Sequence, residues 1–250
     1  MRTLSYFVLA GMCFAAPTTA RPQGTIKSLS KCPVAGTATG ATDQVSNRLK
    51  RRIPPSGDTV TLSFADFRAL QSVVAQRFNI DAHTQKLNLT EAERQGLHTI
   101  PLAHNTVSEG DLVRIVGYLV SPKPHPNTGE TVNCGLKGEK NNDIHITIAE
   151  YPEDSGYVGI VVEMIPQKRP KPWSSTKLKA VQLGGLPVLV VGQLFYDEKH
   201  FVNDDWHHPL GGQPQRMSLF EVHPVTSFLV CRALTTCQPD QSADWAPIGQ

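Results

Sequence analysis

Five segments between residues 112 and 230 are short, apolar and typical of β-strands, and residues 143–150 alternate apolar and polar side chains with the period of two of a half-buried strand. The five segments cover residues 112–120, 143–150, 157–165, 187–196 and 218–230. A helical pattern lies between the third and fourth segments, with Ser174 or Ser175 as its cap and Gly184-Gly185 at its end. Five strands with one helix in that position follow the plan of an OB-like barrel.

Glycine interrupts the first and fourth segments, at Gly117 and Gly192. A closed barrel must coil its strands tightly, and glycine permits the bulge or bend that this requires. We therefore predict a mainly β fold with a five-stranded OB-like barrel over residues 108–232. An open β-sandwich of the same strands is the alternative.

The segment before the barrel, residues 58–107, carries helical signals. Ser63 with Asp66, and Thr90 with Glu93, have the spacing of helix-capping pairs. The apolar positions of the first helix are Phe64, Phe67, Leu70, Val74 and Phe78. Residues 21–57 lack an apolar period and are predicted to form an extended arm, and residues 233–250 a C-terminal tail.

Residues 1–20 have the features of a signal peptide. Arg2 precedes an apolar stretch over residues 4–16, and small residues Thr18 and Ala20 stand where a signal peptidase cleaves. The stretch is too short to span a bilayer as a helix, and no second one follows. The sequence predicts an exported protein, periplasmic or secreted, with no membrane span in the mature chain.

Four cysteines remain beyond the predicted signal peptide: Cys32, Cys134, Cys231 and Cys237. An even number in an exported chain favours disulfides, and four cysteines allow three connectivities. Cys231 and Cys237 are close enough in sequence to close a small loop, which would leave Cys32 to pair with Cys134. Free thiols in a reducing compartment are the alternative.

The formal net charge is only +2, so no global field drives the chain onto nucleic acid or an anionic membrane. One local stretch contains bases, an aromatic residue and no acidic side chain. Its ligand-binding candidates are Lys168, Arg169, Lys171, Trp173, Lys177 and Lys179. An aromatic ring among bases can stack on a nucleobase while the cations contact phosphates. A solvated helix face is the alternative, and the basic run 48–52 is similarly interpreted as a surface arm.

Four titratable residues on the predicted strands form a possible chemical centre: His145, Glu163, Glu221 and His223. Such a group can bind a metal or supply an acid–base pair. The alternative is structural, with His223 at a strand end before Pro224 and Glu163 paired with a buried base such as Arg114. No specific catalytic motif is present. The sequence therefore assigns no catalytic residue, metal ligand or cofactor.

A second histidine-rich patch lies in the loop after the fourth predicted strand. Its members are His200, Asp204, Asp205, Trp206, His207 and His208. Surface metal binding and a solvated polar loop are the two interpretations of this patch.

Several short motifs, in this order and spacing, resemble a family of uncharacterised exported bacterial proteins with an OB-like barrel. The motifs are Cys32-Pro33, Asn47-Arg-Leu-Lys-Arg-Arg52, Thr131-Val-Asn-Cys134, Asp143-Ile-His-Ile146, Val161-Val-Glu-Met164 and Glu221-Val-His-Pro-Val-Thr226. Arg51, where an asparagine is expected, and Phe220, where a tryptophan is usual, depart from the pattern. The resemblance implies the fold and export, and no activity.

Two functions from different classes follow from these observations. The first is an exported binding module for a single-stranded oligonucleotide, a glycan or an envelope protein, because OB barrels bind extended polymers across one sheet face. The second is a metal-dependent hydrolase of the phosphodiester type. A structural envelope protein is a third interpretation. The sequence shows no nuclease-like set of paired arginines with acidic metal ligands, and a shared fold is not evidence of activity.

Overall fold

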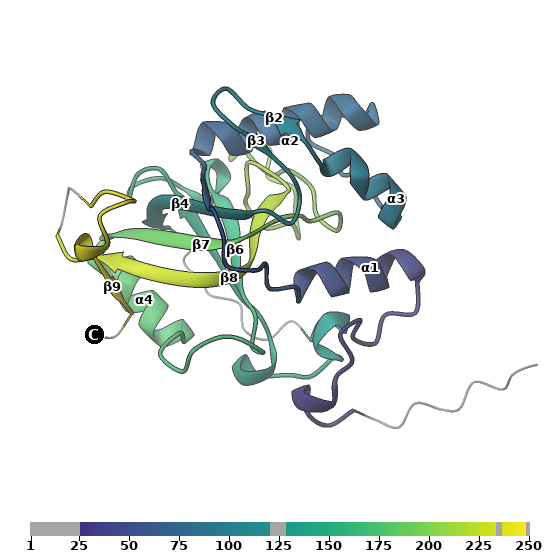
Figure 1. Cartoon of the computed structure of the whole chain (residues 1–250), viewed down its shortest axis with the longest axis horizontal. Helices are drawn as coiled ribbons and strands as arrows, with labels where there is room; N and C mark the ends of the chain where they lie inside the picture. Colours follow the sequence, from purple (N-terminus) through teal and green to yellow (C-terminus); the bar gives the residue numbers. More distant parts are fainter. Residues whose placement is uncertain (1–25, 121–128, 234–236, 249–250) are drawn as a thin grey trace, which may run out of the picture.

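The computed structural model describes residues 26–120, 129–233 and 237–248, and all five predicted barrel strands are present in it. They are β4 (Leu112–Leu119), β5 (Ile144–Ala149), β6 (Ile160–Met164), β7 (Pro187–Tyr196) and β8 (Phe220–Cys231). The strands pair in the order β4-β5-β6-β8-β7, and β7 pairs with β4 to close the barrel (Figure 1). This closure rules out the open sandwich and confirms a mainly β fold with a closed five-stranded barrel.

The predicted helix between the third and fourth strands is α4 (Ser175–Gly184). The Ser174 hydroxyl accepts a hydrogen bond from the backbone N–H of Lys177, and Gly185 ends the helix in the left-handed conformation, with φ of 59°. Because Leu178 is fully buried in the core, α4 is anchored to the barrel. In Figure 1, α4 lies below the strands and α2 above them.

Both predicted strand glycines stand where two backbones approach closely. The β7–β8 register shifts on either side of Gly192, and a side chain there would meet the Pro224 carbonyl oxygen at 2.4 Å. At Gly117 a side chain would meet the Ala149 carbonyl oxygen at 2.6 Å. The tightly coiled strands therefore require glycine at both positions.

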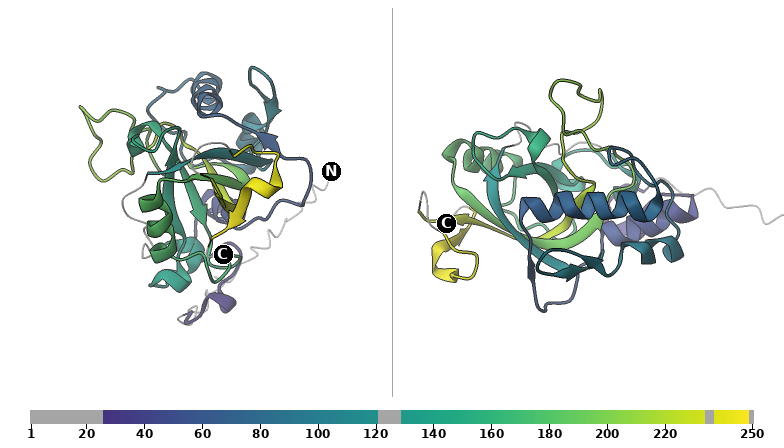
Figure 2. Two further views of the ribbon diagram at one scale, coloured as in Figure 1. Left: turned by 90° about the vertical axis from the view of Figure 1, so that its left-hand side faces the viewer. Right: turned by 90° about the horizontal axis from the view of Figure 1, so that it is seen from above.

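The residues before the barrel form part of the same core. They contain β1 (Val60–Thr61), α2 (Phe64–Phe78), α3 (Glu91–Arg94) and the hairpin of β2 (Ile100–Pro101) and β3 (Thr106–Val107). Both predicted capping boxes are present, at Ser63 and Thr90. Figure 2 shows α2 crossing the barrel, and its buried Phe67, Leu70 and Val74 join the hydrophobic core of the barrel. The core is therefore continuous from α2 into the barrel.

The prediction of an extended arm over residues 21–57 is wrong in its second half, because α1 (Ala41–Lys50) is a helix. Its buried residues are polar: Ser46, Asn47 and Lys50. The Asn47 side-chain amide donates to the Ala35 carbonyl and to Thr131 Oγ1, at 2.9 and 3.2 Å. A helix held by polar contacts shows no apolar period, which is the pattern on which the prediction relied.

The C-terminal tail predicted over residues 233–250 is in part a strand of the sheet. Strand β9 (Trp245–Pro247) pairs antiparallel with β8, and Trp245 is buried against Leu189 and Cys231 in a small second core. Strand β9 has only three residues, and its pairing with β8 is a tertiary contact that so short a segment does not predict.

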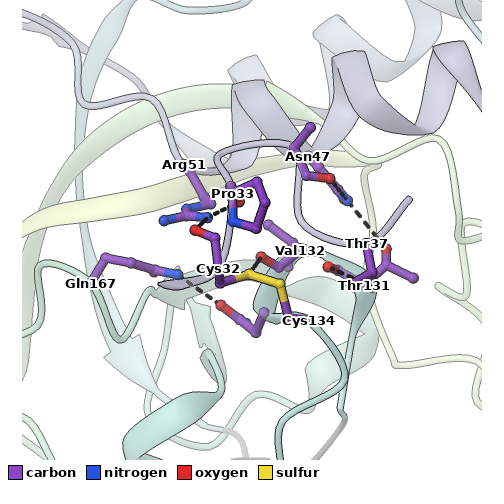
Figure 3. The surroundings of a disulfide bond; sticks show 11 residues. Cys32, Pro33, Thr37, Asn47, Arg51, Thr131, Val132, Cys134 and Gln167 are labelled. Atoms are coloured by element: carbon purple, nitrogen blue, oxygen red, sulfur yellow. Dashed lines mark hydrogen bonds between the residues drawn. A yellow bond between two sulfur atoms is a disulfide. The ribbon is translucent and has the colours of Figure 1, made fainter. Parts of the chain in front are cut away.

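Two disulfides join Cys32 to Cys134 and Cys231 to Cys237, one of the three connectivities that the sequence left open. The first fastens the chain before α1 to the segment that precedes β5 (Figure 3). Within the described residues, no helix is long and apolar enough to cross a membrane. The predicted signal peptide, residues 1–20, lies outside the described residues, as do residues 121–128.

Candidate functional site: a buried ionic cluster

The four predicted residues His145, Glu163, Glu221 and His223 come together on the sheet face opposite the barrel core. His145 of β5 pairs directly with Glu163 of β6 in the strand register, with its Nε2 at 3.0 Å from Glu163 Oε1. The other Glu163 oxygen lies 2.8 Å from His223 Nδ1, and Glu221 Oε2 lies 3.5 Å from the same nitrogen. Glu163 thus stands between two imidazoles.

Further charged residues, which the sequence analysis did not single out, extend this cluster. Asp143 Oδ2 lies 3.6 Å from His223 Nε2, and Glu130 Oε1 lies 3.3 Å from His145 Nε2. Arg216 Nη1 contacts Glu221 and lies 3.1 Å from Asp197 Oδ2. Of these residues, only Asp143 could have been noticed in the sequence, because it is an acidic residue at the start of an apolar strand. We call these residues, together with Lys50 and the four predicted ones, the ionic cluster.

The N-terminal helix α1 covers the ionic cluster. The Lys50 ammonium, at the end of α1, is buried 3.8 Å from Glu130 Oε2 and 5.9 Å from the centre of the Phe195 ring. The Gln193 side-chain amide donates both to the Leu49 carbonyl, at 2.9 Å, and to the His223 carbonyl, at 2.8 Å. These bonds connect the end of α1 to β8 directly above the cluster.

Solvent reaches the ionic cluster only at one edge among the described residues that form it. The side chains of Glu163, Glu221, His223, Asp143 and Arg216 are at most 1% exposed. In contrast, the His145 side chain is 17% exposed and that of Glu130 28%. The centre is therefore closed, with His145 and Glu130 at its opening.

Burial and charge act in opposite directions on the titrations of the cluster. Burial is the largest single effect and lowers the pKa of His223, but the charge of Glu163 and the hydrogen bonds with Glu163 and Glu221 together raise it to about 10. Burial raises the pKa of Glu163, but His145 and His223 together hold it well below its ordinary value. For Asp143 and Glu221 burial prevails, and the pKa is raised. Perturbed titrations of this kind concentrate at functional sites.

The structural alternative for Glu163 was a buried base such as Arg114, and this pairing is wrong. Arg114 Nε donates to Thr61 Oγ1 at 2.6 Å, and Thr61 lies opposite Arg114 in the pairing of β1 with β4. The partners of Glu163 are the two histidines. His223 is likewise more than a strand-end residue, because its ring contacts three carboxylates.

The basic stretch after β6 does not form a stacking platform. Trp173 is buried in the core and makes an edge contact with the Phe228 ring, so it cannot stack on a base. Arg169 donates to the carbonyls of Glu139, Asn142 and Met164 and so fastens a loop. The remaining candidates Lys168, Lys171 and Lys177 are exposed, and Lys179 donates to Gln182.

The histidine-rich patch of the β7–β8 loop is divided in two. His200 turns back and contacts Asp197 at the edge of the ionic cluster. The others, Asp204, Asp205, Trp206, His207 and His208, are exposed. The Trp206 and His207 rings are tilted by 34° relative to one another, with centres 3.6 Å apart, and Trp206 is 66% exposed.

Comparison with known proteins adds no relative: no family model matches the chain, and no match is found among curated proteins or solved structures. The resemblance to exported bacterial OB-like proteins therefore stays a prediction.

Proposed function

We propose that the protein is an exported OB-like binding module that recognises a neutral glycan through the loop between β7 and β8. The observation that carries this proposal is the exposed Trp206, whose ring lies against that of His207 in that loop. OB barrels contact oligosaccharides and oligonucleotides with the loops that join strands one to two and four to five, and the β7–β8 loop is the second of these.

Charge favours a glycan over a nucleic acid at this position. Asp204 and Asp205 precede Trp206 and are exposed, so a phosphate backbone would be repelled. The basic stretch that carries Lys171 and Lys177 holds its only tryptophan in the core. Aromatic surface and positive charge are therefore on different parts of the molecule. A large, partly apolar aromatic ring with a polar edge suits the mixed surface of a sugar.

Burial supports binding over catalysis. A general base or nucleophile must come within hydrogen-bond reach of the substrate, whereas Glu163, Glu221 and His223 are closed off beneath α1. The two disulfides agree with export to an oxidising compartment.

Tryptophan fluorescence provides a direct test, because Trp173 and Trp245 are buried and only Trp206 is exposed to a ligand. We expect titration with chitin and cellulose oligosaccharides to change the emission with little dependence on salt. Trp206→Ala should abolish the change, whereas Leu183→Ala, at another exposed apolar residue, should leave it unchanged.

Oligo-dT and oligo-U serve as competing probes in the same titration. Salt-sensitive binding of either one, lost in a Lys168→Gln/Lys171→Gln/Lys177→Gln variant, would replace the glycan by a nucleic acid. Absence of binding to every probe would overturn the proposal.

A hydrolase is the second candidate, favoured by the convergence of all four predicted residues and by the partial exposure of His145. In that case the protein with added Mn²⁺ or Zn²⁺ should hydrolyse a chromogenic phosphodiester. His145→Ala should remove this turnover while the circular dichroism spectrum stays unchanged.

A further inference from the structure

Three side chains of the ionic cluster converge from three strands in the manner of a metal-ligand set. Asp143 precedes β5, Glu163 is in β6 and His223 is in β8, and one donor atom from each lies within 4.8 Å of the other two. We propose that Asp143, Glu163 and His223 bind a divalent transition-metal ion, Zn²⁺ or Mn²⁺. This inference is independent of the glycan proposal.

The donor atoms of these residues have ion-pair contacts with one another and with His145, but no hydrogen bond of normal geometry. Asp143 Oδ2, both carboxylate oxygens of Glu163 and both ring nitrogens of His223 are buried without such a hydrogen bond to any described residue. His223 Nδ1 and Glu163 Oε2 form an ion pair at 2.8 Å. Buried polar atoms are costly when they lack a hydrogen bond. A single ion can bind Asp143 Oδ2, one carboxylate oxygen of Glu163 and one ring nitrogen of His223.

The charge balance of the ionic cluster also calls for a cation. Five carboxylates face one another there, and Lys50 and Arg216 are the two permanent cations among them. The carboxylates outnumber these permanent cations by three, and uncompensated charge is expensive at this depth. A divalent ion bound in place of the ring proton of His223 offsets most of this excess.

A second group with similar spacing, formed by Asp197, His200 and Glu221, is already occupied by a protein cation. Arg216 is fully buried and contacts both carboxylates of this group. No such guanidinium reaches Asp143 or Glu163 among the described contacts. The metal position is therefore assigned to the first group, and the second provides a natural control.

The donor set and spacing indicate the class of ion. Two carboxylates and one imidazole suit zinc or manganese, whereas Mg²⁺ and Ca²⁺ prefer oxygen ligands alone. Two ligands of a tetrahedral zinc lie about 3.4 Å apart, given metal–ligand distances of about 2.1 Å. The separation between Asp143 Oδ2 and His223 Nε2 is 3.6 Å. The partly exposed edge at His145 and Glu130 offers the route of entry.

Calorimetric titration of the chelator-treated, disulfide-bonded protein tests the site. We expect one Zn²⁺ or Mn²⁺ per chain, with much weaker binding of Mg²⁺. Asp143→Asn preserves the shape of the side chain and its contact with Asn133 Nδ2, and should weaken binding by a factor of about 10 or more. His200→Gln, in the second group, should leave the affinity unchanged.

The inference would be overturned by absence of transition-metal binding, or by equal affinities of the Asp143→Asn and His200→Gln variants. A second measurement is independent of variant folding. Crystals of the unaltered protein grown with Mn²⁺ or Zn²⁺ should give an anomalous peak between Asp143, Glu163 and His223. A peak only elsewhere would equally contradict the assignment.

Discussion

Single charged residues in the ionic cluster are held in place by their neighbours. Arg216 is among the largest fully buried side chains, and removing either partner of a buried ion pair leaves a charge that is costly to bury. Such burial is weak evidence for stability but is typical of sites with a chemical role. The residues at the edge of the cluster are those that solvent, and hence pH, reaches first.

Glu130 makes the stability of the fold depend on acid pH. Burial raises its pKa, but Lys50 and the hydrogen bond from His145 lower it from 4.5 to about 2. A carboxyl whose pKa is depressed on folding stabilises the protein fully above the unfolded pKa, and this stabilisation is lost as the pH falls through the folded pKa. The unaltered protein should therefore lose unfolding free energy as the pH falls from 4.5 to 2. We expect this loss to be smaller in the Glu130→Gln variant.

Urea denaturation at a series of pH values measures this effect. Glu153→Gln, at an exposed turn position, is the matched control and should follow the pH profile of the unaltered protein. If both variants give that same profile, Glu130 is not responsible.

At the scale of elements, helices are attached to the barrel in two different ways. Helix α4 buries an apolar residue, Leu178, whereas α1 buries Ser46, Asn47 and Lys50. The attachment of α4 depends on the apolar surface area that is removed from water, whereas that of α1 depends on hydrogen bonds and charge. An apolar face is visible in the sequence of α4, and the polar face of α1 is not.

Leu178 and Leu183 of α4 form a matched pair for testing this attachment, since they are 0% and 76% exposed. Leu178→Ala should lower the unfolding free energy by about 2–5 kcal/mol, because it leaves a cavity in the core. Leu183→Ala should change it by less than about 0.5 kcal/mol. Chemical denaturation of the two variants provides the measurement, and equal losses would mean that α4 is not anchored through Leu178.

For the whole molecule, the Cys32–Cys134 disulfide holds the N-terminal segment over the ionic cluster. It links residues 102 positions apart, whereas Cys231–Cys237 spans 6. The entropy removed from the unfolded chain grows with the length of the closed loop. The first disulfide therefore acts on the entire arrangement of α1 and barrel, and the second on the local attachment of β9.

Paired serine replacements separate the two disulfides. Cys32→Ser/Cys134→Ser should lower the unfolding free energy by about 5 kcal/mol, and Cys231→Ser/Cys237→Ser by about 2 kcal/mol. Hydrogen exchange should also rise over α1 in the first variant alone. Similar losses of unfolding free energy in both variants, without faster hydrogen exchange in α1, would show that the Cys32–Cys134 disulfide does not hold α1 over the ionic cluster.

The sequence by itself determined the elements of this protein. Strand segments, capping boxes at Ser63 and Thr90, the end of α4 and the glycines at positions 117 and 192 all follow from local periodicity and backbone conformation, which a few neighbouring residues decide. Alternation along β5 and β8 also put His145, Glu221 and His223 on the face away from the core, as observed.

Only the tertiary structure decided how these elements combine. The helix α1, the pairing of β9 and the burial of Trp173 depend on contacts between residues far apart in the chain, which leave no periodic pattern. The same is true of the contacts of Glu130 with Lys50 and of Arg216 with Asp197. Four candidate residues were visible in the sequence because each interrupts an apolar strand. They form one closed cluster beneath α1 because the barrel closes and because a disulfide joins two cysteines 102 positions apart in the sequence.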